Sequence, residues 1–140
     1  MRRKGPEMNS PRRKEIRLPG YDYSQAGLYF LTICTQNSLC LFGTVQEGVM
    51  NLNHAGDMVQ KWWNKVDEKF PEMTLHESVV MPNHLHGIVE INRRDEKDSE
   101  DDDSPTVANV IQWFKTMSIN EYMRGVKQNG WPQFPKRLWQ

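Results

Sequence analysis

The chain of 140 residues is long enough for one domain with a single hydrophobic core and leaves little room for a second. It has 18 basic and 18 acidic side chains, and its 2 cysteines are too few for a disulfide framework. No apolar run approaches the roughly 18 residues of a membrane span, and no apolar segment follows the basic N-terminus as in a secretory leader. We therefore expect a cytoplasmic protein that does not enter a membrane.

The neutral total hides a segregation of charge. Residues 1–17 carry seven Lys or Arg against two Glu, and residues 104–140 carry five against one. Basic ends indicate an anionic partner such as nucleic acid, although basic tails are also commonly solvated without a partner. We expect 1–17 to be a flexible tail. The acidic run 93–103 is expected to be a solvated loop, because it lacks the ligand spacing of a calcium-binding loop.

Two segments of the first half alternate as β-strands do. Residues 28–36 are rich in aromatic and branched side chains, and both faces are apolar, which predicts a central position in a sheet. One face would carry Tyr29, Leu31 and Ile33, and the other Phe30, Thr32 and Cys34. Residues 43–52 alternate around a Glu-Gly pair, which is typical of a small β-hairpin.

Apolar side chains recur at three- and four-residue steps in two later segments, which predicts two amphipathic helices. Asn53 is the expected cap of the first helix, which stops at Phe70 before a proline. Ser104 and Pro105 have the pattern of a cap and a first helical residue, and Gly125 is the expected end of the second helix.

Residues 75–81 and 84–91 are predicted strands joined by a Pro-Asn turn, and the second strand begins with His84 and His86. Because side chains alternate across a strand, the two imidazoles should stand side by side on one face. Imidazole is a common ligand of divalent metals, and two histidines leave positions open for water or substrate. The alternative is a pair of ordinary polar side chains, since a His-x-His pair alone is a weak motif.

Several motifs occur together in a recognisable order. They are Gly-Tyr-Asp-Tyr-Ser (20–24), Tyr-Phe-Leu-Thr-Ile-Cys-Thr-Gln-Asn (29–37), Leu-Phe-Gly (41–43), Leu-Asn-His-Ala-Gly (52–56), Val-Val-Met-Pro-Asn-His-Leu-His-Gly-Ile (79–88), Phe-Lys (114–115) and Leu-Trp-Gln (138–140). This ordered set, from about residue 12 to the last residue, resembles the REP-associated tyrosine transposases. That family is related to the transposases of insertion sequence 200, in the His-hydrophobe-His (HUH) superfamily of single-strand endonucleases.

The resemblance implies an α+β fold, with a ferredoxin-like antiparallel sheet and helices packed on one face. It implies a transposase domain over residues 18–140, in which His84 and His86 hold Mg²⁺ or Mn²⁺ beside the scissile phosphate of single-stranded or hairpin DNA. In such enzymes a tyrosine attacks the phosphorus and becomes joined to the 5′ phosphate. The covalent link conserves the phosphodiester energy, so strand transfer needs no nucleotide hydrolysis.

The chain departs from the family after Gln140, where relatives continue with a further strand and a helix bearing a Tyr-Ile-x-x-Asn-Pro motif. None of its own tyrosines has the context of the nucleophile; they are Tyr21, Tyr23, Tyr29 and Tyr122. We therefore expect a domain truncated at the C-terminus, without the last strand and the catalytic helix, and inactive alone as a transposase. The alternative is a non-catalytic remnant that binds DNA hairpins. A histidine-triad nucleotide hydrolase is disfavoured, because Ile88 stands where that class needs a third histidine.

The resemblance also implies DNA as a partner. The expected DNA contacts are the basic side chains Arg12, Arg13, Lys14, Arg17, Lys115, Lys136 and Arg137. In the non-catalytic alternative, Trp131 or Trp139 would be available for stacking on bases. In a ferredoxin-like sheet the missing strand would pair with residues 28–36, so this strand should have a bare edge, which favours a homodimer or strand exchange.

Overall fold

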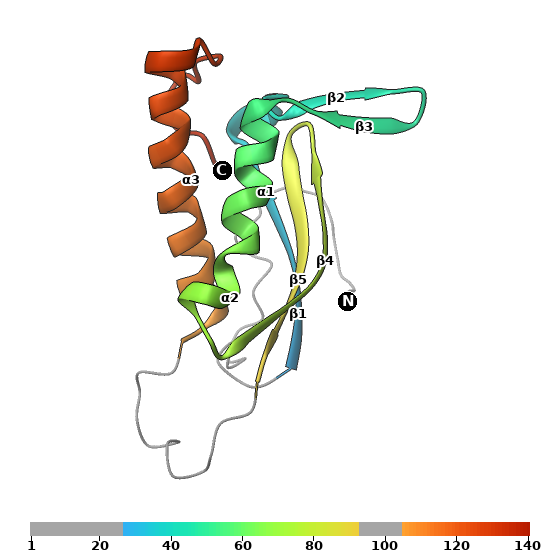
Figure 1. Ribbon diagram of the computed structural model, residues 1–140, viewed down its shortest axis with the longest axis vertical. Coiled ribbons are helices and arrows are strands. Elements are labelled where there is room, and N and C mark those ends of the chain that lie inside the picture. The colour runs from blue at the N-terminus through green and yellow to red at the C-terminus, as the bar shows by residue number, and fades with distance from the viewer. Residues whose placement is uncertain (1–26, 93–104) are drawn as a thin grey trace.

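The computed structural model describes residues 27–92 and 105–140, and the predicted basic tail and acidic loop lie outside them. A 3-stranded sheet is covered on one face by helices, and a 2-stranded hairpin projects from one end (Figure 1). The elements in chain order are β1 (Gly27–Cys34), β2 (Gly43–Gln46), β3 (Val49–Leu52), α1 (His54–Asn64), α2 (Val66–Lys69), β4 (Met73–Met81), β5 (His84–Ile91) and α3 (Val107–Asn129). All strand pairs are antiparallel, so the predicted α+β class is confirmed.

The central strand of the sheet is β5, which lies between β1 and β4. The central position predicted for residues 28–36 is therefore wrong, because β1 is at the edge of the sheet as the described residues form it. Tyr29 and Ile33 of β1 face the helices and are buried. Leu28 and Phe30 lie on the other, open face, where they are 53% and 74% exposed. Within the described residues, the apolar character of that face thus reflects a surface that no helix covers rather than a second buried layer.

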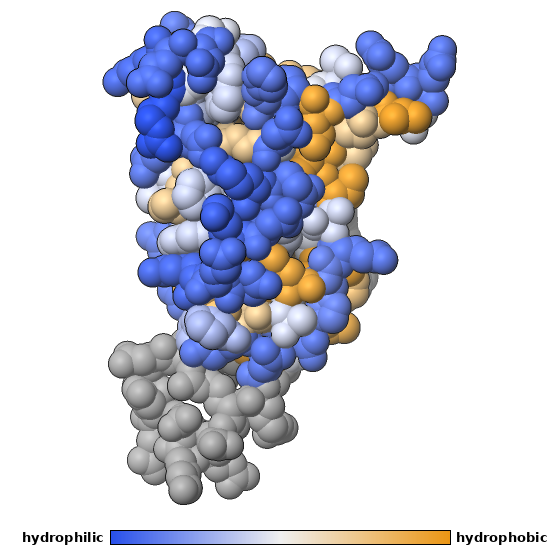
Figure 2. All heavy atoms as spheres, in the orientation of Figure 1, coloured by the Kyte–Doolittle hydropathy of each residue, from blue (hydrophilic) through white to orange (hydrophobic). Residues whose placement is uncertain are grey.

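The hydrophobic core lies between the sheet and helices α1 and α3. Leu85 and Val89 of β5 are fully buried there, together with Trp63 of α1 and Phe114 of α3. The rings of Trp63 and Phe114 meet edge to face, with their centroids 5.6 Å apart. The outer surface of the helices is largely hydrophilic (Figure 2). Within the described ranges, no helix is both long enough and apolar enough to cross a lipid bilayer.

Local signals position the hairpin and the first helix. Glu47 and Gly48 have φ of 54° and 79°, as the two central residues of a tight hairpin turn require, and the predicted hairpin is confirmed. The side chain of Asn53 accepts a hydrogen bond of 2.8 Å from the backbone N–H of Gly56, which confirms the predicted cap. The helix is not continuous to residue 70, however, because it breaks at Lys65 into α1 and α2.

The last helix starts and ends later than its sequence signals predict. Ser104 lies outside the described residues, and Thr106 caps α3 through a capping box with Asn109. The helix continues through Gly125 and ends at Gly130, whose φ of 72° is the left-handed cap conformation. Gly125 serves packing instead, since a Cβ there would lie 2.2 Å from the ring of Trp131.

After α3 the chain returns to the edge of β1. The backbone N–H of Gln36 donates to Leu138 at 2.9 Å, and that of Gln140 donates to Cys34 at 2.8 Å. These bonds form an isolated antiparallel bridge between Thr35 and Trp139. The bridge covers only the C-terminal end of β1, so the edge of the rest of the strand has no strand partner within residues 27–92 and 105–140.

Candidate metal and nucleic-acid site

His84 and His86 lie at the start of the central strand β5, on the face of the sheet that the helices leave uncovered. Leu85 between them is buried against the helices, as the period of a strand requires. The centroids of the two imidazole rings are 4.5 Å apart, and the ring planes meet at 77°. The predicted side-by-side placement is confirmed, and the role of the pair as metal ligands stays a prediction.

Each ring is oriented by a hydrogen bond at its Nδ1 atom. His84 Nδ1 lies 2.7 Å from Oδ1 of Asn83, and His86 Nδ1 lies 3.0 Å from Oγ1 of Thr32 on the neighbouring strand. When Nδ1 donates its proton to these oxygens, the lone pair of each ring is at Nε2, the atom available for a metal. Neither Nε2 has a hydrogen-bond partner among the described side chains and backbone. Metal-binding histidines commonly have this arrangement.

The Pro82-Asn83 turn holds the start of β5 in place. The carbonyl oxygen of Pro82 accepts hydrogen bonds from the backbone N–H groups of Leu41 and Phe42, at 2.9 and 3.0 Å. The carbonyl oxygen of Asn83 accepts from both the backbone N–H and the hydroxyl of Thr35, at 3.0 and 3.2 Å. Because both carbonyl groups of the turn are bound, the first histidine enters the sheet in a defined orientation.

Beneath the histidines, β5 rests on a tryptophan. A Cβ atom placed at Gly87 would lie 2.5 Å from the ring of Trp63, so only glycine allows this approach. The indole Nε1 of Trp63 is buried and has no hydrogen-bond partner in the described part of the chain. Neither Gly87 nor Thr32 is recognisable as a supporting residue from the sequence, because nothing in a single strand reveals what packs under it or beside it.

The electrostatics of the site keep His84 neutral. Burial lowers the pKa of His84, and the neighbouring His86 lowers it further. A neutral imidazole is the form that binds a metal.

Two of the predicted DNA contacts lie at the same end of the sheet. Lys115 Nζ donates to the backbone carbonyl of Gln140 at 3.0 Å, and Gln140 is bonded to Cys34, whose register partner is His84. Burial lowers the pKa of Lys115, the positive charge of Arg137 lowers it further, and Cys34 raises it. Lys115 is thus linked through Gln140 and Cys34 to the end of the sheet at which His84 lies, and Arg137 lies near enough to Lys115 to affect its charge.

Of the other predicted contacts, the structure describes only Lys136, which is exposed. Arg12, Arg13, Lys14 and Arg17 lie outside the described residues.

The aromatic residues of the C-terminal segment differ from expectation. Trp139 is only 2% exposed, between Phe42 and Phe114, and its Nε1 donates to Ser118 at 3.0 Å. The expectation that Trp139 stacks on bases is therefore wrong, because this residue belongs to the core. Trp131 is half-buried against α3.

The tyrosines of the described residues are placed for packing. Tyr29 faces the core, on the opposite side of the sheet from the histidines. Tyr122 is fully buried on α3, where its hydroxyl donates to the carbonyl of Pro132 at 2.7 Å, and burial raises its pKa to about 12. Neither hydroxyl is poised to attack a phosphate at the histidines. Tyr21 and Tyr23 lie outside the described residues.

Two imidazoles are a donor set that fits a divalent metal with open positions. No group of three or more His, Cys, Asp or Glu side chains that could hold a metal occurs among the residues that the structure describes. Among the described residues, an ion at the pair would therefore have only these two side-chain ligands, and its other positions would be open to water or ligand oxygens. Since Mg²⁺ prefers an all-oxygen shell, imidazole nitrogens suit Mn²⁺ better.

Comparison with known proteins gives partial matches. No family model matches the chain. An uncharacterized protein of Haemophilus influenzae is 47% identical over 79 residues, which cover 56% of this chain and 44% of that protein. The solved structure of a REP-associated tyrosine transposase bound to a REP hairpin is similar with a TM-score of 0.56 and 17% identity, over 89% of this chain and 58% of that chain. This likeness shows the fold. The chain thus spans less than two thirds of the length of either protein.

Proposed function

We propose that the chain is an HUH-type DNA-binding domain of the tyrosine transposase class, which binds single-stranded or hairpin DNA at the open face of its sheet. The observation that carries this proposal is the pair of oriented imidazoles, each with its Nε2 atom unpartnered among the described residues. The likeness in fold to a transposase bound to a REP hairpin supports DNA as the ligand. The basic side chains of Lys115 and Arg137 at the same end of the sheet support it further.

Each residue of the site has a separate part in binding. His84 and His86 would hold a divalent ion through Nε2, while Asn83 and Thr32 keep the two rings in place. A bound divalent ion neutralises charge on phosphate oxygens and orients the scissile bond. The guanidinium of Arg137 attracts the phosphate backbone, which contributes an affinity that decreases with salt.

Cleavage requires a nucleophile, and we propose that this chain alone binds DNA without cutting it. The two tyrosines of the described residues are committed to the core, so neither supplies the attacking hydroxyl. Complete transposition therefore belongs to a protein that carries a further tyrosine beside the histidines. The second candidate function is that of a remnant that binds DNA hairpins without a metal. It differs from the first only in that His84 and His86 do not hold an ion.

The test is binding of a fluorescent DNA hairpin with a single-stranded 5′ extension, measured by anisotropy with and without Mn²⁺. We expect Mn²⁺ to strengthen binding to the wild type but not to His84→Ala. His54→Ala, which removes an exposed histidine at the start of α1, is the matched control and should behave as the wild type. Binding that is equally tight in His84→Ala with and without Mn²⁺ would favour the non-catalytic binder. A covalent protein–DNA adduct on a denaturing gel would contradict the proposal that this chain binds DNA without cutting it.

The edge of β1 supports a further proposal, that two copies of the chain associate. Backbone groups of Cys34 and Gln36 point outward to the C-terminal segment, so by the period of a strand those of Leu28, Phe30 and Thr32 point outward too. A long uncharged edge of this kind favours pairing with another strand. We propose a homodimer through this edge, formed by antiparallel addition of β1 to its copy.

A further inference from the structure

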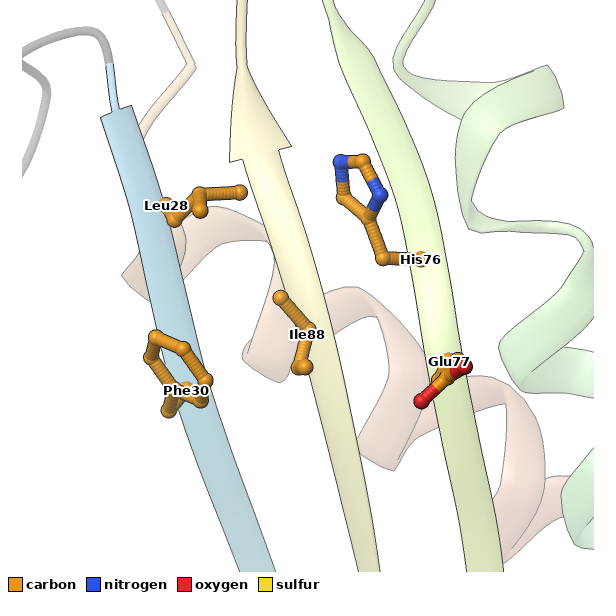
Figure 3. A pocket seen from close by; sticks show the side chains of 5 residues that line it. All are labelled: Leu28, Phe30, His76, Glu77 and Ile88. Carbon is orange, nitrogen blue, oxygen red and sulfur yellow. The ribbon is translucent and has the colours of Figure 1, made fainter.

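A hollow on the open face of the sheet adjoins the histidine pair, and we propose that it receives an unstacked DNA base with an exocyclic amino group. The inference rests on the proposed function, because the base in the hollow belongs to the same DNA strand whose phosphate would lie at the histidines. The hollow has a volume of about 450 Å³ and is lined by Leu28, Phe30, His76, Glu77 and Ile88 (Figure 3).

An irregularity of β4 forms the polar wall of the hollow. The register of β4 against β5 shifts between Leu75 and Ser78, so that His76 and Glu77 both stand opposite Ile88. Such a bulge brings one extra residue into the strand and re-aims the side chains beside it. Figure 3 shows both side chains on the same side of the sheet as Phe30, with helices behind the strands. The bulge therefore adds a carboxylate and an imidazole to a surface that is otherwise apolar.

The opposite wall is an exposed aromatic ring. Phe30 extends from β1 beside Leu28, and at 74% it is the most exposed of the large hydrophobic side chains that the structure describes. Proteins that bind single strands use such rings as platforms, because every base has a face that can stack. Ile88 lies between the two walls on β5 and forms the floor of the hollow.

The hollow is continuous with the histidine pair. A second depression of about 370 Å³ shares Phe30, Glu77 and Ile88 with the first and extends to Thr32 and His86. Phe30 and Thr32 are two residues apart on one face, about 6.8 Å along the strand. Since the Thr32 hydroxyl is bonded to His86, a nucleotide next to a phosphate at the histidines reaches the ring of Phe30.

The charges at the two ends of this surface select different parts of a nucleotide. Lys115 and Arg137 lie at the histidine end and attract phosphate. At the other end are the carboxylates of Glu77 and of Glu90, the latter bonded to His76 at 2.9 Å, and they repel phosphate. A carboxylate only accepts hydrogen bonds, so it favours the exocyclic amino group of cytosine, adenine or guanine, which has two N–H donors. Thymine has one donor, N3–H, and the carbonyl oxygens on either side of it repel a carboxylate.

The test compares binding of fluorescein-labelled oligo(dC) and oligo(dT) to the full chain in the presence of Mn²⁺. We expect Phe30→Ala to weaken oligo(dC) binding by between about 5-fold and 100-fold, the range of stacking on an aromatic ring. Val49→Ala, a truncation of an exposed side chain on the projecting hairpin, is the matched control and should have no effect. Removing a carboxylate strengthens binding to any polyanion, so the readout for Glu77→Gln is the ratio of the oligo(dC) affinity to the oligo(dT) affinity. This ratio should be above about 5 in the wild type and near 1 in Glu77→Gln.

The outcomes separate the inference from the function on which it rests. The base site would be overturned if the wild type, Phe30→Ala and Glu77→Gln all bound both oligonucleotides equally. The proposed function would still stand if Mn²⁺ strengthened binding to the wild type but not to His84→Ala. No binding by the wild type would overturn both. If Phe30→Ala lowers the mass of the protein in solution while its DNA affinity is unchanged, the ring serves contact between copies and the base site is wrong.

Discussion

The indole ring of Trp63 packs against the backbone of Gly87, on the opposite side of β5 from the two histidine rings. Trp63 is itself held edge to face by Phe114 of α3, so the strand that carries the histidines rests on the core. A side chain at position 87 would have to displace either the ring or the strand. The position of His86 therefore depends on the contact between Gly87 and Trp63 on the opposite face of the sheet.

Replacing Gly87 by alanine tests this contact. The added methyl group is expected to lower the free energy of unfolding by about 1–3 kcal/mol, as overpacking of a core does, and to weaken Mn²⁺ binding by shifting His86. Urea denaturation and calorimetric titration with Mn²⁺ measure the two effects. Trp63→Phe makes room at the same place, so the double variant should recover part of the lost affinity. Additive losses in the double variant would show that Gly87 and Trp63 act separately.

Thr32→Val tests the orientation of His86 from the neighbouring strand. The substitution keeps the shape of the side chain and removes the 3.0 Å hydrogen bond to Nδ1. Loss of such an outer partner commonly costs about 10-fold to 100-fold in metal affinity, so we expect weaker Mn²⁺ binding at nearly unchanged stability. Thr44→Val on the projecting hairpin is the control, since Thr44 is exposed and distant in the topology. Unchanged affinity in Thr32→Val would mean that packing alone orients the ring.

The lowered pKa of His84 predicts a dependence of stability on pH. Its usual value of 6.5 applies to the unfolded chain, which therefore binds a proton at a higher pH than the folded chain. The stabilising contribution is complete above pH 6.5 and is lost as the pH falls toward the lower pKa of the folded state. Urea denaturation between about pH 8 and pH 5 should show a shallower loss in His84→Gln than in the wild type. Parallel curves would mean that His84 titrates normally.

Tyr122 predicts the opposite dependence in alkali. Burial raises its pKa from 10.0 to about 12, so the folded chain keeps the phenolic proton that the unfolded chain loses first. The contribution is complete below pH 10.0 and is lost as the pH rises through about 12. Tyr122→Phe keeps the ring against Trp131 and Phe134 and removes only the hydrogen bond to Pro132, at a cost of about 1 kcal/mol. Its stability should decline less between these pH values than that of the wild type.

Most of the edge of β1 has no strand partner among the described residues, which predicts a dimer whose population depends on concentration. Sedimentation equilibrium should give a mass that rises from that of one 16.5 kDa chain toward twice that value as the protein concentration increases. Backbone pairing is the expected cause of association. Phe30→Lys places a positive charge on the β1 strand of each copy, so repulsion between the two charges should weaken association. A mass that stays at 16.5 kDa at every concentration would contradict the dimer.

Local patterns predicted most of the elements, because they depend on neighbours in the chain. The alternation of residues 84–91 predicted a strand with both histidines on one face, and Asn53 predicted the start of the first helix. Gly125 was misleading, since glycine ends helices but also permits close packing, and only the folded chain brings Trp131 onto it. Where strands lie in a sheet is a long-range property as well. An apolar outer face on β1 is therefore compatible with both a buried centre and an uncovered edge.

The supporting residues of the site follow the same rule. The spacing of His84 and His86 is visible in the sequence, but Thr32 is more than fifty positions away along the chain and meets His86 only through the pairing of β1 with β5. The bulge that brings His76 and Glu77 together has no sequence signal of its own, because it depends on the register of two strands.

The helices of this domain cover one face of the sheet, and the histidines lie on the other. The sheet therefore separates two groups of residues. One group forms the hydrophobic core and maintains the native state, and the other would contact a substrate. Natural variation in a gene for such a domain can alter or erase the chemistry without destroying the protein. An inactivated copy would still be a well-folded molecule, available for selection toward a new task.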